Sequence, residues 1–442
     1  MANIYIGFSV GFFILRYYFL YYIYIIMTDS IPTIFERELS HDVVDPKAMF
    51  KMPAESDVVV GRKTVKLAPQ DGGGGDISPD NNTAIRFKIR SGDFIDADSV
   101  YCTVKYKQSD SSSDGTNYAL VPNGVNCLIR EIRLRSGTGA QIETIREAGL
   151  LQSVLMKFSH SKTHNDTVHT IAGGGSTKDL RMGYGTADTY EELAFHLPSS
   201  FLNTCGKFVD TNAMKGLIIE IELYSNAIAL EGKGSADTPS YNLSNPQIVY
   251  DEVMVSPAYK KSYLMHMARN GSINIPYSTY THSKSASNSS VRISRSVSRL
   301  KDIITVARLD SNLVKGEDSL GKFGTLADSG TWSYQIGSEN LPVGSCQTNA
   351  QTYREALKVF GRHKDAYCGS VTLAEFKAGS GIIAVDCELS PGTPFSGTKT
   401  SNQPDIILNN NSLFDSSPTT LDSWLHHERI MKLGNGVVEI LE

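Results

Sequence analysis

Residues 247–277 read QIVYDEVMVSPAYKKSYLMHMARNGSINIPY and lie near the middle of the chain, between two halves that read alike. The first part, residues 248–255, alternates in side-chain character as a β-strand with two different faces does. Ser256 and Pro257 end this strand, because proline has no N–H for a ladder and suits the first turn of a helix, where serine is a good N-cap. The stretch therefore predicts a strand that leads directly into a helix.

This helix is predicted to cover residues 259–269. Tyr259, Tyr263 and Met267 recur along one stripe of it, as the contact side of a short surface helix requires. Gly271 follows at the position where glycine commonly ends a helix.

A new β region opens at Ser272, so the chain is predicted to contain two β modules joined by a linker helix. The first module spans residues 58–256, the linker helix 257–271 and the second module 272–442. The 442 residues, 40% of them hydrophobic, provide ample material for two domain cores. The 37 glycines and 21 tyrosines, with few long helical periods, favour an all-β protein with many turns.

The first module is predicted to contain short strands separated by turns. Residues 85–89 and 100–107 alternate between apolar and polar side chains, as half-buried strands do. The most strand-like run is GLIIEIELYS, residues 216–225, whose apolar side chains share one face; we expect it to lie centrally in a sheet. One inserted helix is predicted for residues 143–158, where apolar residues recur at three- and four-residue spacing.

The second module repeats this design. Residues 273–282 are an opening strand, and DIITVARL, residues 302–309, resembles the central strand of the first half. A second inserted helix is predicted for residues 349–360. The chain ends with a hairpin that turns at residues 434–436, Gly-Asn-Gly.

The size of the modules selects among all-β folds. Each has roughly 170 to 200 residues, about eight strands and long loops. Immunoglobulin sandwiches are nearer to about 100 residues and have shorter connections, so jelly rolls fit better. The predicted fold is all-β, with two consecutive eight-stranded jelly rolls and short inserted helices.

The first 26 residues form an apolar extension with its own interpretation. Residues 4–26 are long and apolar enough to span a bilayer, but Arg16 lies near their centre and no A-x-A cleavage site follows. The residues from Met27 onward look like an ordinary protein start. We expect residues 1–26 to be a translated upstream extension; the alternative is a membrane anchor. Residues 27–57 are expected to form an arm on a neighbouring subunit or a flexible tail.

Charge and cysteine content exclude some functions. A formal net charge of −5 provides no broad cationic surface for a phosphate backbone, so no direct nucleic-acid partner is expected. The six cysteines include no C-x-x-C pair, so we expect free, mostly buried thiols in a reducing compartment. They are Cys102, Cys127, Cys205, Cys346, Cys368 and Cys387.

No catalytic, cofactor or metal site is predicted. The chain has no G-x-S-x-G and no H-E-x-x-H, and its glycine runs lack the Gly-Lys-Ser/Thr of a phosphate loop. His160, His164 and His169 could ligate a metal, but they lie on a polar loop without a carboxylate placed to orient them.

Paired acidic residues and the last histidines receive structural interpretations. Asp251 and Glu252 are sequence neighbours that point to opposite faces of a strand, so they do not make a glycosidase pair. Residues 426–428, His-His-Glu, lie in the predicted last hairpin. We interpret them as a solvated edge.

Four stretches in order carry a resemblance to a known family. They are FHLPSSFLNTCGKFVDTNAMKGLIIEIEL (195–223), INIPYSTYTHSK (273–284), WSYQIGSENLPVGSCQTNAQTYREALKVFG (332–361) and SWLHHERIMKLGNGVVEIL (423–441). In these stretches, and in the spacing of its halves, the chain resembles the double jelly-roll major capsid proteins of Polinton-like viruses, virophages and their large DNA-virus relatives. The segment before Met27 departs from that pattern.

The resemblance implies a structural protein of the virion rather than an enzyme. It implies homotrimers with a pseudo-hexagonal outline that tile an icosahedral shell, with minor capsid or penton proteins and an inner membrane as further partners. Loops at 160–185, 231–246 and 310–330 would form the outer crown, and the arm would lie on the inner side. Two other classes remain open: a membrane-anchored or secreted β-sandwich adhesin, and a carbohydrate-active β enzyme.

Overall fold

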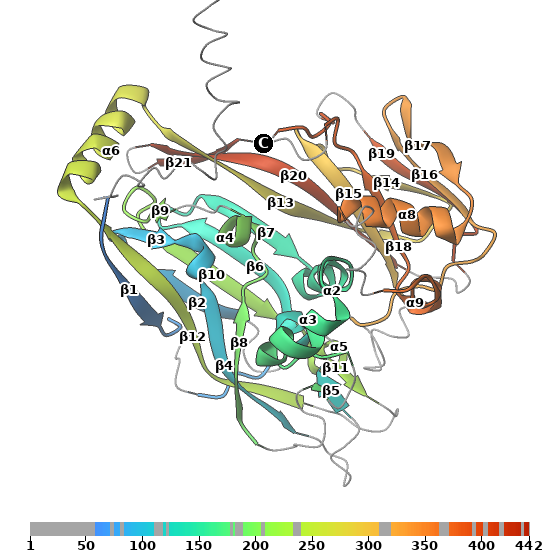
Figure 1. Ribbon diagram of the computed structural model, residues 1–442, viewed down its shortest axis with the longest axis horizontal. Helices are drawn as coiled ribbons and strands as arrows, with labels where there is room; N and C mark the ends of the chain where they lie inside the picture. Colours follow the sequence, from blue (N-terminus) through green and yellow to red (C-terminus); the bar gives the residue numbers. More distant parts are fainter. Residues whose placement is uncertain are drawn as a thin grey trace, which may run out of the picture. The chain divides into compact units, whose positions relative to one another are not determined.

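The computed structural model describes most of residues 58–442, which form one compact unit (Figure 1). The described ranges are 58–70, 75–79, 84–109, 118–120, 123–176, 180–181, 189–204, 208–232, 240–308, 320–361, 371–390, 395–400, 405–414, 420–434 and 437–441. The expectations for residues 1–26 and for the arm at 27–57 fall outside these ranges and stay predictions. Within them, every helix is too short or too polar to cross a bilayer.

The strands of the first module form two antiparallel sheets. The β1 sheet contains β1 (Val59–Leu67), β12 (Ser240–Val255), β3 (Phe94–Asp96), β4 (Tyr101–Ser109), β8 (Glu191–His196) and β9 (Phe208–Asp210). The β2 sheet contains β2 (Ala84–Ile89), β10 (Leu217–Leu223), β6 (Ile129–Ser136) and β7 (Gln141–Arg146). A short pair, β5 (Tyr118–Leu120) and β11 (Leu230–Gly232), stands apart from both.

The second module also has two antiparallel sheets. The β13 sheet contains β13 (Ile273–Ala286), β20 (Thr420–Gly434), β15 (Leu300–Arg308) and β18 (Ile382–Asp386), with β21 (Val437–Leu441) paired to β20. The β14 sheet contains β14 (Ser290–Ile293), β19 (Ile406–Asn411), β16 (Thr331–Ile336) and β17 (Glu339–Cys346). The pairing of β21 with the end of β20 confirms the predicted last hairpin.

Both modules connect their strands in the same order. In the first module β3 and β4 follow one another along β12 and together occupy one strand position, as β8 and β9 do beside them. Counted this way, one sheet of each module has the order first, eighth, third, sixth, and the other has second, seventh, fourth, fifth. Two facing antiparallel sheets of eight strands define a jelly roll. The prediction of two consecutive jelly rolls is confirmed.

The predicted central strands hold the core. β10 lies between β2 and β6, and Leu217, Ile219 and Leu223 on it are buried, as their shared face predicts. β15 lies between β20 and β18 and is buried along nearly its whole length. The buried apolar side chains of both modules belong to one connected cluster. The two modules are therefore fused through a common core, although the composition led us to expect two separate cores.

Inserted helices follow the fifth strand of each jelly roll, α2 (Ala148–Ser159) after β7 and α8 (Asn349–Val359) after β17. The helix predicted at 349–360 is confirmed, with Thr348 as its N-cap. The helix predicted from residue 143 was placed too early, because residues 141–146 pair with β6 as strand β7. Glu147 then adopts a left-handed backbone conformation (φ 52°), and the helix begins after it.

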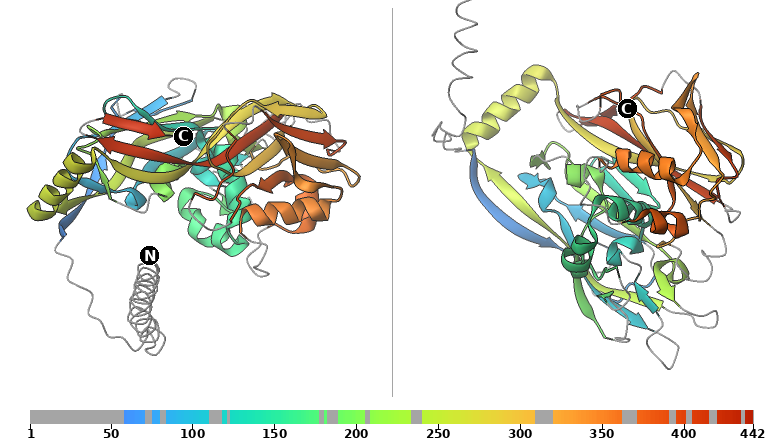
Figure 2. Two further views of the ribbon diagram at one scale, coloured as in Figure 1. Left: turned by 90° about the horizontal axis from the view of Figure 1, so that it is seen from above. Right: turned by 45° about the vertical axis from the view of Figure 1, so that its right-hand side comes forward.

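The shorter helices lie in the connections between strands. They are η2 (Ala97–Ser99), η3 (Gly124–Leu128), α3 (Lys162–Thr167), η4 (Val168–Ala172), α4 (Ser200–Thr204), α5 (Asn226–Ala229) and α9 (Leu373–Gly379). In the two views of Figure 2, α2 lies beside α8 and α9, so the inserted helices of the two modules meet.

The linker is helix α6 (Pro257–Asn270), as the central stretch predicts. The Ser256 hydroxyl accepts a hydrogen bond from the Tyr259 N–H, and Gly271 closes the helix in the left-handed conformation (φ 75°). Met267 is buried, and Tyr263 packs edge-on against Phe94 with ring centroids 5.2 Å apart. The predicted stripe therefore attaches the helix to the first module.

Two of the predicted loops contain regular structure. The loop predicted at 231–246 is wrong at both ends, because residues 231–232 belong to β11, which pairs with β5, and β12 begins at residue 240 and pairs with β4. The loop predicted at 160–185 includes α3 and η4. In both places polar side chains hide the regular backbone, since one face of each element is solvated. Of the loop predicted at 310–330, residues 310–319 lie outside the described ranges.

Candidate functional site at the junction of the two modules

The two jelly rolls contact each other through strands and helices. β7 and α4 of the first module pack on β13 of the second. The ring of Phe201 on α4 meets the ring of Tyr277 on β13 edge-on, with centroids 5.1 Å apart, and the Tyr277 hydroxyl donates to the carbonyl of Ile142 at 2.7 Å. Residues far apart in the chain thus form one buried junction.

Glu143 on β7 is a fully buried carboxylate at this junction. It accepts hydrogen bonds from the Ser199 hydroxyl at 2.5 Å, the Phe201 N–H at 3.2 Å and, from the second module, the Thr279 hydroxyl at 2.8 Å. Burial raises the pKa of Glu143, and these donors oppose part of the rise. The carboxylate therefore joins β13 to β7 through a satisfied polar network.

A buried ion pair lies nearby on β15 and β20. Arg308 Nε donates to Asp422 Oδ2 at 2.6 Å, and both side chains are almost completely buried. The same guanidinium lies 3.3 Å from Glu147 of the first module, and the Nε2 atom of His282 lies 2.8 Å from Asp422 Oδ1. The group links the β13 sheet to the chain segment that opens α2.

The pKa of Asp422 reflects these contacts. Burial alone would raise it, but hydrogen bonds from His282 and Arg308, with the charge of Arg308, outweigh burial and hold the pKa below its usual value. The ionised form is therefore the stable one at neutral pH. An ionised buried carboxylate needs its partners in place, so the network favours one orientation of the modules.

Helix α2 makes the third contact across the junction. Phe158 on α2 stacks on Phe360 at the end of α8, with ring centroids 5.2 Å apart, and meets Phe376 on α9 edge-on at 6.1 Å. Lys157 lies over the ring of Phe323, 4.7 Å from its centroid. The inserted helices of the two jelly rolls thus contact each other directly.

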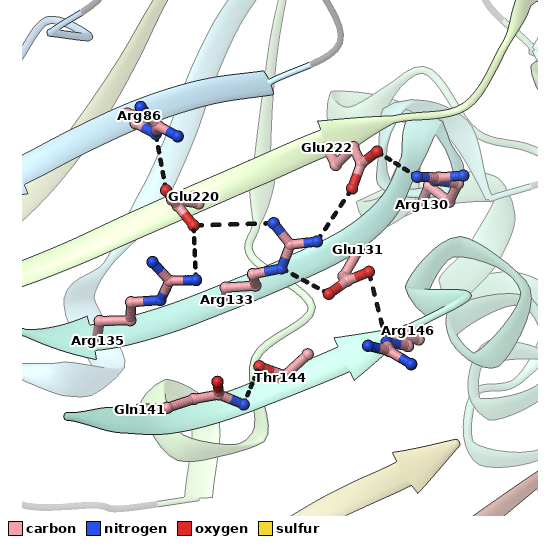
Figure 3. Close-up of polar contacts among 10 residues, drawn as sticks. All are labelled: Arg86, Arg130, Glu131, Arg133, Arg135, Gln141, Thr144, Arg146, Glu220 and Glu222. Carbon is pink, nitrogen blue, oxygen red and sulfur yellow. Dashed lines mark hydrogen bonds and ion pairs between the residues drawn. The ribbon is translucent and has the colours of Figure 1, made fainter. Parts of the chain in front are cut away.

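The outer face of the β2 sheet carries an alternating ladder of ion pairs (Figure 3). Glu220 on β10 lies 2.7 Å from Arg86 on β2 and 3.5 Å from Arg135 on β6. Arg133 lies 2.6 Å from Glu131 and 3.4 Å from Glu222. Because arginines lie between the carboxylates and outnumber them, this face presents paired carboxylates and no converging carboxylate pair of the kind that glycoside hydrolysis uses.

A groove of about 1110 Å³ lies between the helices α2, α3 and η4 and the strands β4 and β8. Apolar side chains of Met156, Leu193 and Phe195 line it. At its rim Val168 and Ile171 are 61% and 62% exposed, which is a high exposure for two neighbouring branched apolar residues. The rim therefore leaves two branched apolar side chains in contact with water beside the groove.

The three loop histidines line this groove without forming a ligand set. The rings of His160 and His164 stack with centroids 4.4 Å apart. His169 is buried, with Nε2 2.9 Å from the carbonyl oxygen of Asn123, and burial lowers its pKa. Across the described ranges, no three His, Cys, Asp or Glu side chains gather in a way that could hold a metal ion.

Residues 426–428 do not form the solvated edge that the sequence suggested. They lie on β20, which runs between β13 and β15 and is therefore a central strand. His426 stacks on Tyr280 and its Nδ1 lies 2.6 Å from Asp302 Oδ2. His427 is fully buried, and burial lowers its pKa to about 3, so it is neutral at physiological pH. The hairpin pattern predicted the end of β20 correctly, but it did not indicate that the strand begins at Thr420 and runs through the middle of the sheet.

Four of the six cysteines lie in the described ranges, and all four are free and buried. Burial raises the pKa of Cys102 to about 12 and that of Cys127 and Cys346 to about 11. Cys205 and Cys368 lie outside the described ranges. For the four described thiols, the expectation of free, buried cysteines is confirmed.

The sequence did not indicate that the charged side chains of the junction would meet. Glu143 was assigned to a helix, and Arg308 and Asp422 stood beside apolar runs without any pattern of their own. The available signal was a single charge within a strongly apolar strand, which indicates a buried partner. The identity of that partner could not be read, because it lies on another strand.

These features define a class by fold, a double jelly roll whose two modules meet at a buried polar junction. No protein-family model matches the chain, and no curated protein matches it. The chain does match solved structures. The chain is similar to PBCV-1 VP54, in a crystal structure fitted into a cryo-EM reconstruction of the virophage Sputnik, at 11% identity and a TM-score of 0.59, covering 89% of this chain and 99% of that one.

Two further structures agree. The chain is similar to a protein in the cryo-EM structure of the Sputnik virophage, at 10% identity and a TM-score of 0.59, with 90% of this chain and 92% of that one covered. It is similar to the Faustovirus major capsid protein at 11% identity and a TM-score of 0.57, with 88% and 92% covered. This chain has the double jelly-roll fold of these viral proteins over almost their full length.

Proposed function

We propose that this chain is a viral major capsid protein that assembles as trimers and tiles an icosahedral shell. The observation that carries the proposal is the repetition of one eight-stranded topology twice in one chain, shared over almost the full length with the Faustovirus major capsid protein and PBCV-1 VP54. The proposed role is structural, with no enzymatic activity and no cofactor, and the proposed location is the virion.

The architecture suits a tile. Three subunits of two jelly rolls place six similar barrels around one axis, which gives a pseudo-hexagonal outline. A cyclic trimer closes through heterologous contacts, and the contacts between trimers remain open to extend a lattice. A tile must keep the angle between its barrels, and the buried network around Glu143 and Asp422 supports that rigidity.

We propose that the apolar rim of the groove contacts the next subunit in the trimer. Val168 and Ile171 are more than half exposed, and a soluble single chain rarely leaves such a pair in water beside an apolar groove. A second copy of the chain is the occupant that a closed ring supplies at every subunit. Burying both side chains would contribute a few kcal/mol per contact, at about 1.5 to 3 kcal/mol for each fully buried branched residue.

The remaining assignments are proposals of the same kind. The jelly rolls correspond to residues 58–256 and 272–442, with the linker at 257–271. Residues 233–239 and 310–330 stay proposed for the outer crown, together with the rest of 160–185, whereas Val168 and Ile171 are proposed for the subunit contact. The arm is proposed to lie on the inner side, near minor capsid or penton proteins or an inner membrane, and residues 1–26 to be absent from the mature protein.

Solution mass and electron microscopy test the proposal. Protein expressed from Met27 should elute with three times the mass of one chain by light scattering, and micrographs should contain hexagonal particles or sheets. A stable monomer at high protein concentration, with no hexagonal particles under any assembly condition, would overturn it. Intact mass of the chain from native particles decides whether residues 1–26 are retained.

A further inference from the structure

A second cavity lies at the junction and is of a different kind. It has a volume of about 360 Å³ and opens between β6 and β7 of the first module and β13 of the second. Arg130 and Arg146 line it from the first module, and Lys284 and Arg295 line it from the second. Both walls are therefore cationic, and the cavity is mostly polar, unlike the groove.

The carboxylates that reach this cavity already have partners. Glu131 lies 2.6 Å from Arg133, which is outside the cavity lining. Glu147 accepts from the Tyr224 hydroxyl at 2.7 Å and from Arg308 at 3.3 Å. Their charges are thus largely compensated from behind.

The cations of the cavity are compensated less well. Arg130 pairs with Glu222, and Arg146 is 3.7 Å from Glu131. Lys284 and Arg295 are exposed, and within the described ranges no ion pair joins either of them to a carboxylate. Four cationic side chains therefore face two carboxylates, and the cavity has an excess of positive charge.

We propose that this cavity binds a small polyphosphate, of the class of pyrophosphate and triphosphate, that bridges the two jelly rolls. Its volume is at the lower end of ligand sites, which run from about 300 to 1,000 Å³, so it suits a compact ion. One arginine guanidinium can donate two parallel hydrogen bonds to the oxygens of one phosphate group. Such charge-assisted hydrogen bonds are stronger than hydrogen bonds between neutral groups. Cations on opposite walls suit an ion with several charged groups better than a single phosphate.

The site has a structural consequence that goes beyond the proposed function. Because its walls come from different modules, the ion binds only when the junction is closed. A ligand that binds only the folded state raises the free energy of unfolding according to its concentration and dissociation constant. The polyphosphate would therefore act as an ionic bridge across the junction, beside His282, which lines the cavity and contacts the buried Asp422.

Calorimetric titration with sodium triphosphate tests the proposal on the chain from Met27, in magnesium-free buffer, with sodium chloride at matched ionic strength as the reference. The wild-type chain should bind one triphosphate per subunit. The double variant Lys284→Ala/Arg295→Ala should weaken binding about tenfold or more, because each of the two substitutions removes a charged hydrogen-bond donor to the phosphate oxygens. Lys284→Ala alone changes one exposed side chain and should weaken binding in the same direction.

A matched double variant controls for overall charge. Lys88→Ala/Lys105→Ala removes two exposed cations of β2 and β4 that do not line the cavity, so its affinity should equal that of the wild type. Equal affinity of wild type and Lys284→Ala/Arg295→Ala, or heats no larger than those of sodium chloride, would overturn the proposal. Neither result bears on the trimer, so failure of this site and failure of the proposed function are distinguishable.

Discussion

Asp422→Asn is the substitution that tests the buried junction most directly. It keeps the shape of the side chain and removes its charge. Arg308, whose side chain is 4% exposed, then keeps Glu147 at 3.3 Å as its remaining carboxylate, and His282 loses its charged acceptor. The cationic guanidinium stays buried without its nearest anion.

The cost follows from the burial of the pair. Removing one partner of a buried ion pair destabilises a protein by about 3 to 5 kcal/mol, because the other charge is left uncompensated. With an unfolding entropy near 2.1 cal/mol/K per residue, the compact unit of residues 58–442 should lose about 4 to 6 °C in Tm for this loss of stability. We expect Asp422→Asn to lower Tm by that amount.

Thermal unfolding followed by calorimetry and circular dichroism at pH 7 measures the change. The matched control is Asp405→Asn, because Asp405 also pairs with the Nε of an arginine, Arg292, but at the surface, where the arginine side chain is 63% exposed. Exposed pairs contribute about 0 to 1 kcal/mol, so the control should change Tm by about 1 °C or less. If the two variants unfold at the same temperature, the reasoning about the junction is wrong.

Four further predictions follow from the same contacts. The difference in unfolding free energy between wild type and Asp422→Asn should be constant above about pH 5 and shrink as pH falls through the depressed pKa of Asp422. The reason is that protonation then removes the charge of Asp422 in the wild type as well. Urea titrations from pH 3 to 7 measure this difference. Ile171→Asp should shift the trimer to monomer in light scattering, whereas Val343→Asp, at a site 90% exposed and outside the groove, should leave the trimer intact. A thiol reagent at pH 8 should label at most two of the six cysteines before unfolding and all six after it, and a higher native count would contradict the burial of the four described thiols. Phe158→Ala should cost about 3 to 5 kcal/mol and make the connection between the modules more sensitive to limited proteolysis, and unchanged cleavage would show that α2 does not hold them together.

Local patterns in the sequence were sufficient for the fold class and for the linker. The boundaries of α6 agree with the prediction to within two residues, because Ser256, Pro257 and Gly271 act through their own backbone and nearest neighbours. The alternation of residues 216–225 predicted a central strand, because a strand buried on its core face must place apolar side chains at every second position. Repetition of such patterns in both halves predicted two β modules, and the size of the modules and their long loops then favoured jelly rolls.

The same patterns were ambiguous where an element is short or covered. Residues 141–158 contain both a strand and a helix, and the apolar spacing of the helix continued into the strand. Pairing with β6 decided the matter for residues 141–146. The polar residues 240–246 looked like a loop until β4 supplied their partner strand.

The sequence by itself thus determined which segments alternate, where they stop and that the design occurs twice, because strand faces and helix caps depend on residues close together in the chain. Only the tertiary structure decided that Glu143 meets Thr279, 136 residues away, that Arg308 meets Asp422, 114 residues away, and that cations from both modules face one cavity. The physical reason is that a periodic pattern specifies which face of a strand is buried, whereas the partner of a buried charge is specified by the packing of strands that are distant in the chain.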